Sequence, residues 1–317
     1  MTAKSPLTKD QKESEQIAPN IFLVHGKNNG RFPYSNSVLV AGNEGKFTLV
    51  DTGCGIDVLR TIKEKFNVNC IINSHTHPDH SAGNWLFRDS VSAIYVPREG
   101  YDTSGNIVAL SERLAEPGFL AEYWRDFVAK VMDFRNCRPT DMYDEKKSFE
   151  FGTVALLPIH TPGHTLDHYC LYEPNQRILF SFDYDLSPFG PWYGHRESSI
   201  PLFKNSIEKL RKLDIRILVP GHGNVIETDI RDQLSAFSSK FDERDTRVLS
   251  LLEPKGKTID QLVEMAPIYG KYPYAEPLLR YWEGKMIEKH LEGLISKEKV
   301  IRKEKYFCPK GPKVATK

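Results

Sequence analysis

One short stretch of this 317-residue sequence decides how the rest is interpreted: Asn73-Ser74-His75-Thr76-His77-Pro78-Asp79-His80-Ser81-Ala82-Gly83-Asn84. Three histidines and one aspartate fall within six residues, at the end of an apolar run over 70–73 that predicts a strand. Core packing does not account for them, because each buried imidazole or carboxylate would need a polar partner. A divalent cation is such a partner, so we interpret the stretch as a candidate metal site.

The spacing within this stretch supports the same interpretation. Alternate side chains of an extended chain point to the same side, so His75 and His77 can reach one ion. A turn at Pro78, followed by a helix that begins at Asp79 or His80, would direct the next two ligands to a neighbouring position.

Four other loops place one His or Asp directly after a predicted strand. They are Leu49-Val50-Asp51-Thr52-Gly53, Thr161-Pro162-Gly163-His164-Thr165, Ser181-Phe182-Asp183-Tyr184 and Val219-Pro220-Gly221-His222-Gly223. A strand that ends in a tight turn presents such a side chain from a rigid scaffold. If the strand ends meet at one edge of the sheets, five His and three Asp come together there.

With these motifs the sequence resembles the metallo-β-lactamase superfamily, and in particular its glyoxalase II-like branch of dinuclear hydrolases. The resemblance covers roughly residues 20–250 and comprises five motifs in the family's order: DTG, HxHxDH, PGHT, an aspartate at a strand end, and PGHG. It implies an α/β protein built as an αββα sandwich.

The resemblance also implies a ligand set for two divalent ions. The implied ligands are His75, His77 and His164 for the first ion, Asp79, His80 and His222 for the second, and Asp183 as the bridge. Asp51 is implied to orient a ligand, because a ligating imidazole needs its other nitrogen anchored. Imidazole and carboxylate ligands without thiolate favour Zn²⁺ and also suit Fe²⁺ and Mn²⁺.

Such a centre predicts metal-assisted hydrolysis. Coordination lowers the pKa of water to about 7, so a hydroxide activated by two metals could attack a small ester, thioester or lactone, with Asp79 and Asp183 as catalytic carboxylates. Two other enzyme classes stay open: a metallo-nuclease acting on RNA or another phosphodiester, and a persulfide dioxygenase with one iron and fewer ligands. A true lactamase is less expected, because resistance enzymes are usually exported and no signal peptide is visible.

Around the motifs the sequence predicts two strand-rich halves within a domain over 21–250. Strands are expected at 21–24, 37–40, 47–50, 70–73, 154–159, 169–172, 178–182 and 215–219, and helices at 57–66, 199–213 and 226–248. Helical spacing and little strand character over about 97–147 predict a helical insertion.

The two ends of the chain differ from this domain. Residues 1–20 are expected to be a polar leader. Thr258 and Gln261 form a capping-box signature at the start of a small winged-helix-like helical domain over 254–306, with a long helix at 274–295 and a short strand at 299–302. A basic tail is expected at 307–317.

The substrate is the part of the function that the motifs define least. The aromatic loop after Asp183 makes Trp192, Tyr193 and His195 candidates for substrate binding. The insertion could cover the site, with Tyr123, Trp124 and Arg135 as candidates. We expect His168 to pack in the core or to orient a ligand, not to bind metal.

Composition limits the partners and the compartment. Lys and Arg total 43 against 42 Asp and Glu, so no overall field favours nucleic acid or a membrane. No apolar run reaches the ~18 residues of a spanning helix, and the first twenty residues lack an apolar segment. Five scattered cysteines, an odd number without a CxxC pair, favour a reducing cytoplasm over a disulfide framework.

The C-terminal stretch leaves two questions about partners. From Gly284 to Lys317 there are ten Lys or Arg against four Glu. These basic residues could contact the phosphates of a nucleic acid. The lack of an RNA-binding motif favours a solvated surface instead, so a small-molecule substrate is preferred to nucleic acid. The apolar face of the helix at 274–295 fits either a homodimer or a contact within the chain.

Overall fold

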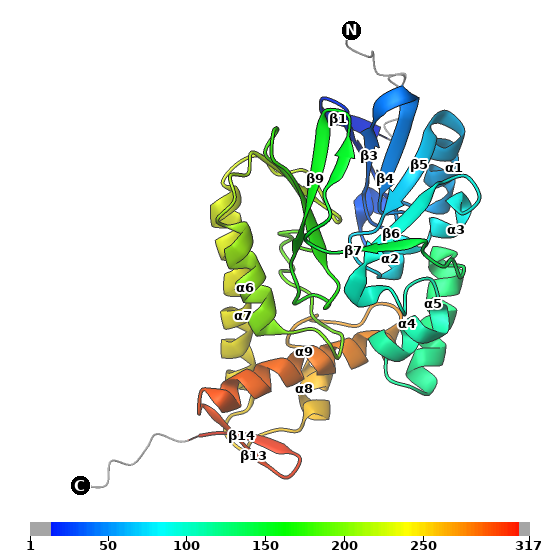
Figure 1. Cartoon of the computed structure of the whole chain (residues 1–317). Coiled ribbons are helices and arrows are strands. Elements are labelled where there is room, and N and C mark those ends of the chain that lie inside the picture. The colour runs from blue at the N-terminus through cyan, green and yellow to red at the C-terminus, as the bar shows by residue number, and fades with distance from the viewer. Residues whose placement is uncertain (1–13, 311–317) are drawn as a thin grey trace.

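Two β-sheets packed face to face form the centre of the molecule, and helices cover their outer faces (Figure 1). The computed structural model describes residues 14–310. The first sheet has the order β1 (Ser14–Ala18), β2 (Ile21–Val24), β3 (Ser37–Ala41), β4 (Lys46–Val50), β5 (Asn67–Ile72), β6 (Ala93–Pro97) and β7 (Asp141–Tyr143). The second has the order β12 (Ile217–Pro220), β11 (Ile178–Phe182), β10 (Tyr169–Glu173), β9 (Val154–His160) and β8 (Phe149–Phe151).

The helices lie outside these sheets. α1 (Ile56–Lys65) and α3 (Asn84–Phe87) flank the first sheet, and α6 (Ile200–Leu210) and α7 (Ile230–Leu251) flank the second. α2 (Pro78–Ser81) lies near the ends of the strands, with α4 (Ile107–Leu114) and α5 (Phe119–Met132) beyond it. α8 (Ile259–Met265), α9 (Glu276–Ser296) and the hairpin of β13 (Val300–Lys303) and β14 (Tyr306–Pro309) complete the chain at the bottom of Figure 1.

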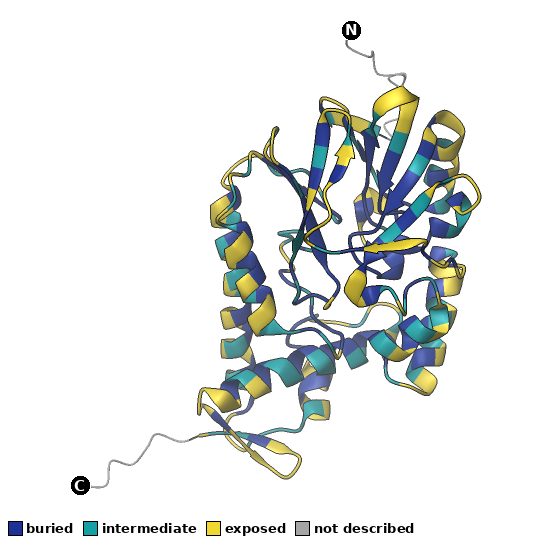
Figure 2. Cartoon of the chain, in the orientation of Figure 1, coloured by how far each residue is buried: buried dark blue, intermediate teal, exposed yellow. Residues whose placement is uncertain are grey.

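Alternating side chains on the strands produce the four layers. Val38 and Val40 of β3 face the second sheet, whereas Leu39 between them packs with the residues of α1. In β11, Phe180 faces the first sheet and Leu179 joins the core beneath α6 and α7. Burial on both faces explains why these strands are almost continuously apolar, and Figure 2 shows the buried layers between exposed outer helix surfaces. The predicted αββα sandwich is confirmed.

Three features differ from the sequence-based expectations. β1, which pairs with β2, lies inside the predicted polar leader, whose residues 1–13 are outside the described part of the chain. β6 and β8 were not predicted, and β7 lies within the expected helical insertion and pairs with β6 in parallel. β14 begins at Tyr306 and occupies the first residues of the predicted basic tail, and residues 311–317 of that tail are not described. Short strands without clear alternation carry too little pattern to be recognised.

The C-terminal elements pack onto the sandwich. The predicted capping box is present at Thr258 and Gln261, where α8 begins. α9 carries Met286, Ile287 and Leu291 into the same core as α6 and α7. The winged-helix likeness and the domain boundaries stay predictions.

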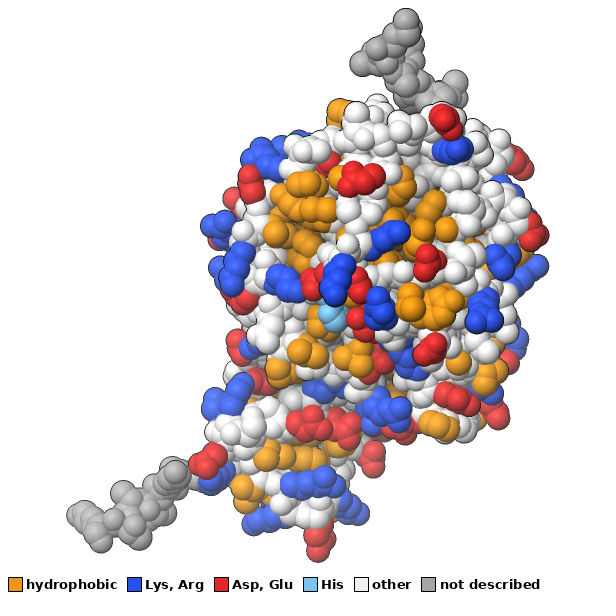
Figure 3. Space-filling model, in the orientation of Figure 1, with side chains coloured by type: hydrophobic (Ala, Val, Ile, Leu, Met, Phe, Trp, Pro, Cys, Tyr) orange, Lys and Arg blue, Asp and Glu red, His pale blue; other side chains and the backbone are white. Residues whose placement is uncertain are grey.

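The outer surface shows no dominant charge on the face that Figure 3 displays, where Lys and Arg are interspersed with Asp and Glu. This agrees with the formal net charge of +1. Within residues 14–310, no helix is both long and apolar enough to cross a membrane.

Candidate metal centre

The ends of four strands and the short helix α2 bring the seven predicted ligands into one cluster. Ligand-type atoms lie within 4.8 Å of one another in two groups, one of His75, His77, His164 and Asp183, the other of Asp79, His80 and His222. Loops after β5, β9, β11 and β12 supply five of these ligands, and α2 carries the other two, Asp79 and His80.

Asp183 lies between the two groups, and its two carboxylate oxygens face different ones. Oδ2 is 2.9 Å from Nε2 of His164 and 3.8 Å from Nε2 of His75. Oδ1 is 2.8 Å from Nε2 of His80 and 3.6 Å from Nε2 of His222. This arrangement is suited to a carboxylate that bridges two cations.

Asp51 orients the imidazoles from behind the cluster. Its Oδ2 lies 2.7 Å from Nδ1 of His80 and accepts a hydrogen bond from the Ser74 hydroxyl at 2.8 Å. Its Oδ1 accepts the backbone N–H of Ser74 at 2.7 Å, and the same hydroxyl is 3.0 Å from Nδ1 of His75. A carboxylate can only accept, so it holds the proton of His80 on Nδ1 and leaves Nε2 free to face the cluster.

Backbone carbonyls orient two other imidazoles. Nδ1 of His164 lies 3.0 Å from the carbonyl oxygen of Trp192, and Nδ1 of His222 lies 2.6 Å from that of Gly30. His77 is turned the other way, with Nδ1 only 2.9 Å from Nε2 of His164. His77 therefore presents Nδ1 to the first group, whereas the others present Nε2.

The residues fit a pair of divalent cations. Nε2 of His75 is buried and has no hydrogen-bond partner among the described residues, and Oδ2 of Asp183 is 3.8 Å away from it. Such an orphaned polar atom is costly unless a ligand satisfies it. Burial also lowers the pKa of His75 and His77 well below the usual value, which keeps both imidazoles neutral, as metal ligands must be.

Two further histidines hold protons that cations would replace. Burial lowers the pKa of His80, but the carboxylates of Asp183 and Asp51 outweigh it and raise that pKa well above the usual value. Burial likewise opposes protonation of His222, yet Asp79 and Asp183 raise its pKa to about 9. Metal binding at this cluster should therefore release protons.

The DTG loop owes its close packing to Gly53. A Cβ at this position would lie 1.5 Å from the carbonyl oxygen of Asp79. Only glycine allows the loop after β4 to approach α2 this closely. The preceding Asp51 has a left-handed backbone, with φ of 58°, which aspartate tolerates better than most residues.

His168 lies outside both ligand groups, as expected. Its side chain is fully buried, and Nδ1 lies 2.8 Å from the hydroxyl of Thr161. Nε2 accepts the backbone N–H of Asp183 at 3.4 Å. His168 therefore supports the loop that carries Asp183.

A buried ionic network beside the cluster was not anticipated. Arg113 of α4 donates to Asp167 Oδ1 at 2.7 Å and to Glu197 Oε1 at 2.6 Å. Asp167 also accepts from the hydroxyl of Thr76 at 2.6 Å. Thr76 lies between His75 and His77, so the network ties the helical insertion to the loop that carries these two candidate ligands. No motif marks these residues, which are far apart in the sequence.

A cavity of about 730 Å³ opens from the cluster, with His77, Asp79, His164, Asp183 and His222 at its base. Trp192 and His195 line this cavity, and their role in substrate binding stays a prediction. Trp124 of α5 lines it too.

Three other candidates do not line this cavity. Tyr193 is fully buried in the core, where its hydroxyl lies 2.7 Å from Nε2 of His290, so its prediction as a substrate-binding residue is wrong. Arg135 stacks on Trp85, 3.8 Å from the ring centre, and Tyr123 packs beside Phe119.

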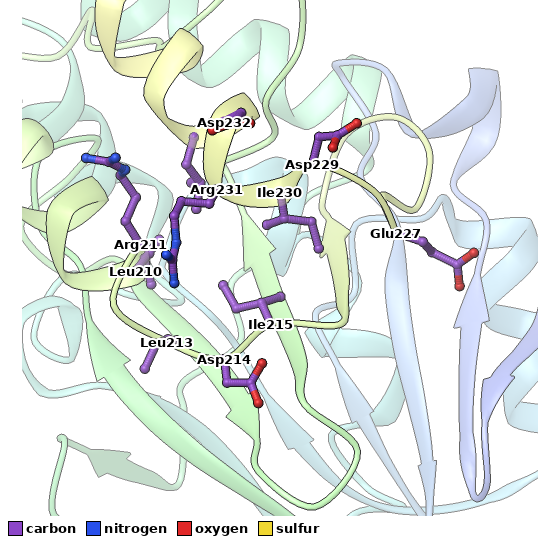
Figure 4. A pocket seen from close by; sticks show the side chains of 11 residues that line it. Leu210, Arg211, Leu213, Asp214, Ile215, Glu227, Asp229, Ile230, Arg231 and Asp232 are labelled. Atoms are coloured by element: carbon purple, nitrogen blue, oxygen red, sulfur yellow. The ribbon is translucent and has the colours of Figure 1, made fainter.

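A second cavity of about 250 Å³ lies between the end of α6 and the start of α7 (Figure 4). Its lining includes Arg211, Asp214, Glu227 and Arg231, and none of the predicted ligands. It has no part in the candidate metal centre.

The αββα sandwich and its histidine-aspartate cluster define a protein of the metallo-β-lactamase type. The model of the metallo-beta-lactamase superfamily matches residues 30–222, and the chain belongs to this superfamily.

Known proteins similar to this chain include thioesterases. An atrochrysone carboxyl ACP thioesterase from Cryptosporiopsis sp. (strain 8999) is 21% identical over 76% of this chain, which spans 66% of that relative's length. An acyl-coenzyme A thioesterase from Bos taurus is 29% identical over 60% of this chain and 73% of its own length. The crystal structure of a metallo-beta-lactamase family protein from Thermus thermophilus superposes with a TM-score of 0.73, at 21% identity, over 93% of this chain and all of that one. That likeness supports the fold.

Proposed function

We propose that this protein is a metal-dependent hydrolase that cleaves thioesters at a centre holding two divalent ions. The observation that carries the proposal is Asp183, whose two oxygens face two separate ligand groups at the base of a large cavity. The similarity to two thioesterases favours a thioester over the ester and lactone substrates that the motifs also allow. Zn²⁺ is the preferred metal, with Fe²⁺ and Mn²⁺ compatible with the same ligands.

When bound, the ions would supply a nucleophilic hydroxide at neutral pH and polarise the thioester carbonyl. The protein's own side chains would hold the ions and orient the ligands around them. His75, His77 and His164 would hold the first ion, and His80, His222 and Asp79 would hold the second. Asp51 keeps the proton of His80 on Nδ1.

The carboxylates and the cavity complete the proposed mechanism. Asp79 lies at the base of the cavity with Oδ2 3.5 Å from Nε2 of His222, where it can orient the attacking water and accept its proton. Apolar walls exclude bulk water, which strengthens electrostatic interactions at the reacting carbonyl. We place the enzyme in the cytoplasm on the sequence argument alone.

Metal analysis combined with a substrate panel tests this proposal. We expect close to two metals per chain, thioester hydrolysis that a chelator abolishes, and recovery of activity on adding Zn²⁺. Asp183→Ala and His77→Ala should lose turnover while circular dichroism stays unchanged.

Other outcomes would overturn the proposal. Activity that survives complete metal removal would contradict the mechanism. Cleavage of RNA without thioester hydrolysis would favour a nuclease. Oxygen consumption with glutathione persulfide and one iron per chain would favour a dioxygenase.

A further inference from the structure

The cavity above the metal centre is far larger and more apolar than hydrolysis of a small acyl group requires. Its volume of about 730 Å³ lies in the upper part of the range for small-molecule sites. Its walls include a set of large apolar side chains, namely Phe32, Trp124, Phe127, Val128, Met132, Leu279 and Trp282. Polar ligand-type groups are concentrated at the metal end.

Two regions outside the five motifs build these walls. α5 supplies Trp124, Phe127, Val128 and Met132 from the insertion. α9 and the segment before it supply Tyr269, Leu279 and Trp282 from the C-terminal unit. The C-terminal unit is therefore part of the candidate active site, although no motif predicted this.

Hydrogen bonds hold the C-terminal wall against the loop that follows the bridging aspartate. The indole N–H of Trp192 donates to the hydroxyl of Tyr269 at 2.6 Å. Lys289 of α9 donates to the carbonyl oxygen of His195 at 2.7 Å. The ring centres of Trp192 and Trp282 are 5.4 Å apart in an edge-on contact. The apolar space is thus built into the fold.

The cavity lining also carries charged residues. Asp79 and Asp183 belong to the two ligand groups, and Asp185 follows Asp183 by two residues. Arg31 and Lys271 line the cavity as well, and both residues are exposed. Exposed cations suit an anionic carrier group, whereas the apolar walls suit the acyl part of the substrate.

We propose that this cavity binds the acyl group of the thioester substrate, and that it selects an apolar acyl group of six carbons or more, straight-chain or aromatic. The proposal rests on the proposed thioesterase function and adds to it the acyl class and the residues that select it. Val128 and Met132 of α5 are the specificity-determining residues that we assign.

A series of coenzyme A thioesters with acyl groups from acetyl to tetradecanoyl, and a benzoyl and a naphthoyl thioester, tests the acyl class. Each methylene that leaves water contributes about 0.8 kcal/mol, which is roughly a fourfold gain. We expect kcat/KM to rise by up to fourfold per methylene until the cavity is full. Equal kcat/KM for acetyl and dodecanoyl thioesters would overturn the proposal.

A matched pair of variants on α5 tests the position of the site. Val128→Phe places a larger side chain in the cavity, whereas Val131→Phe makes the same change at a side chain that is 41% exposed and outside the lining. Val128→Phe should lower the ratio of dodecanoyl to acetyl kcat/KM at least tenfold, as expected if two methylenes lose their contacts. Val131→Phe should leave that ratio unchanged. Met132→Phe provides a second lining variant if Val128→Phe does not fold.

Binding of dodecanoic acid to chelator-treated protein, followed by tryptophan fluorescence, separates this proposal from the proposed function. If no thioester is hydrolysed but dodecanoic acid binds, and Val128→Phe weakens binding tenfold, the acyl site stands and the thioesterase function fails. If thioesters are hydrolysed without regard to chain length and the acid does not bind, the acyl site fails and the function stands.

Discussion

Replacing Asp51 by Asn tests whether this carboxylate determines which ring nitrogen of His80 is free to bind a metal ion. The change keeps the shape of the side chain but converts one acceptor oxygen into an NH₂ donor. If the remaining oxygen keeps the N–H of Ser74, the NH₂ group faces Nδ1 of His80, 2.7 Å away in the wild type. His80 would then have to carry its proton on Nε2, the atom that faces the metal position.

The magnitude of the effect follows from the hydrogen bond that is lost. A buried hydrogen bond to a charged group contributes about 1.5 to 3 kcal/mol, which corresponds to roughly 10- to 150-fold in an equilibrium constant. Removing a partner that orients a metal-bound histidine typically costs about 10- to 100-fold in affinity or activity. We therefore expect Asp51→Asn to weaken metal binding at the group of Asp79, His80 and His222 by about 10- to 100-fold.

Competition with a chromophoric chelator would measure the two metal dissociation constants, and kcat/KM would be measured at saturating metal. Asp89→Asn is the matched control, because Asp89 is exposed on the surface. If Asp51→Asn binds both ions as tightly as the wild type, the proposed role of Asp51 is wrong. Loss of both ions together with an altered circular dichroism spectrum would indicate a structural role instead.

Three other changes test separate parts of the structure. Gly53→Ala should lower the metal content per chain, since its Cβ would displace the carbonyl of Asp79; an unchanged metal content would contradict the packing argument. Burial raises the pKa of Asp167, but Arg113 outweighs this effect and keeps that pKa below its ordinary value of 3.8. The ionised carboxylate therefore stabilises the fold above about pH 4, and this stabilisation is lost as the pH falls through the lowered pKa. Asp167→Asn should therefore reduce the free energy of unfolding, measured with urea, by about 3 kcal/mol at pH 7. Below pH 4 the free energies of unfolding of the variant and the wild type should become more similar. Thr258→Ala should cost about 1 kcal/mol in the same assay by removing the cap of α8, and no loss would show that the cap is energetically unimportant.

The sequence was most informative where a residue's role depends on its immediate neighbours. A histidine or aspartate that follows an apolar strand and precedes a glycine turn lies at the end of that strand wherever the strand is placed. The capping box at Thr258 is local in the same sense, and it was predicted correctly. The direction of Tyr193 could not be inferred in this way, because a loop rich in turns has no regular period.

The sequence alone therefore determined the superfamily, the αββα layers and which side chains would meet at the strand ends, because these depend on local patterns repeated in a known order. The folded chain decided how Asp183 divides its two oxygens between the ligand groups, how Arg113 and Asp167 support the metal loop, and which helices wall the cavity. These features come from contacts between segments distant in the chain. An apolar helix face shows only that it will be buried, and the partner that buries it is set by the packing of the whole molecule.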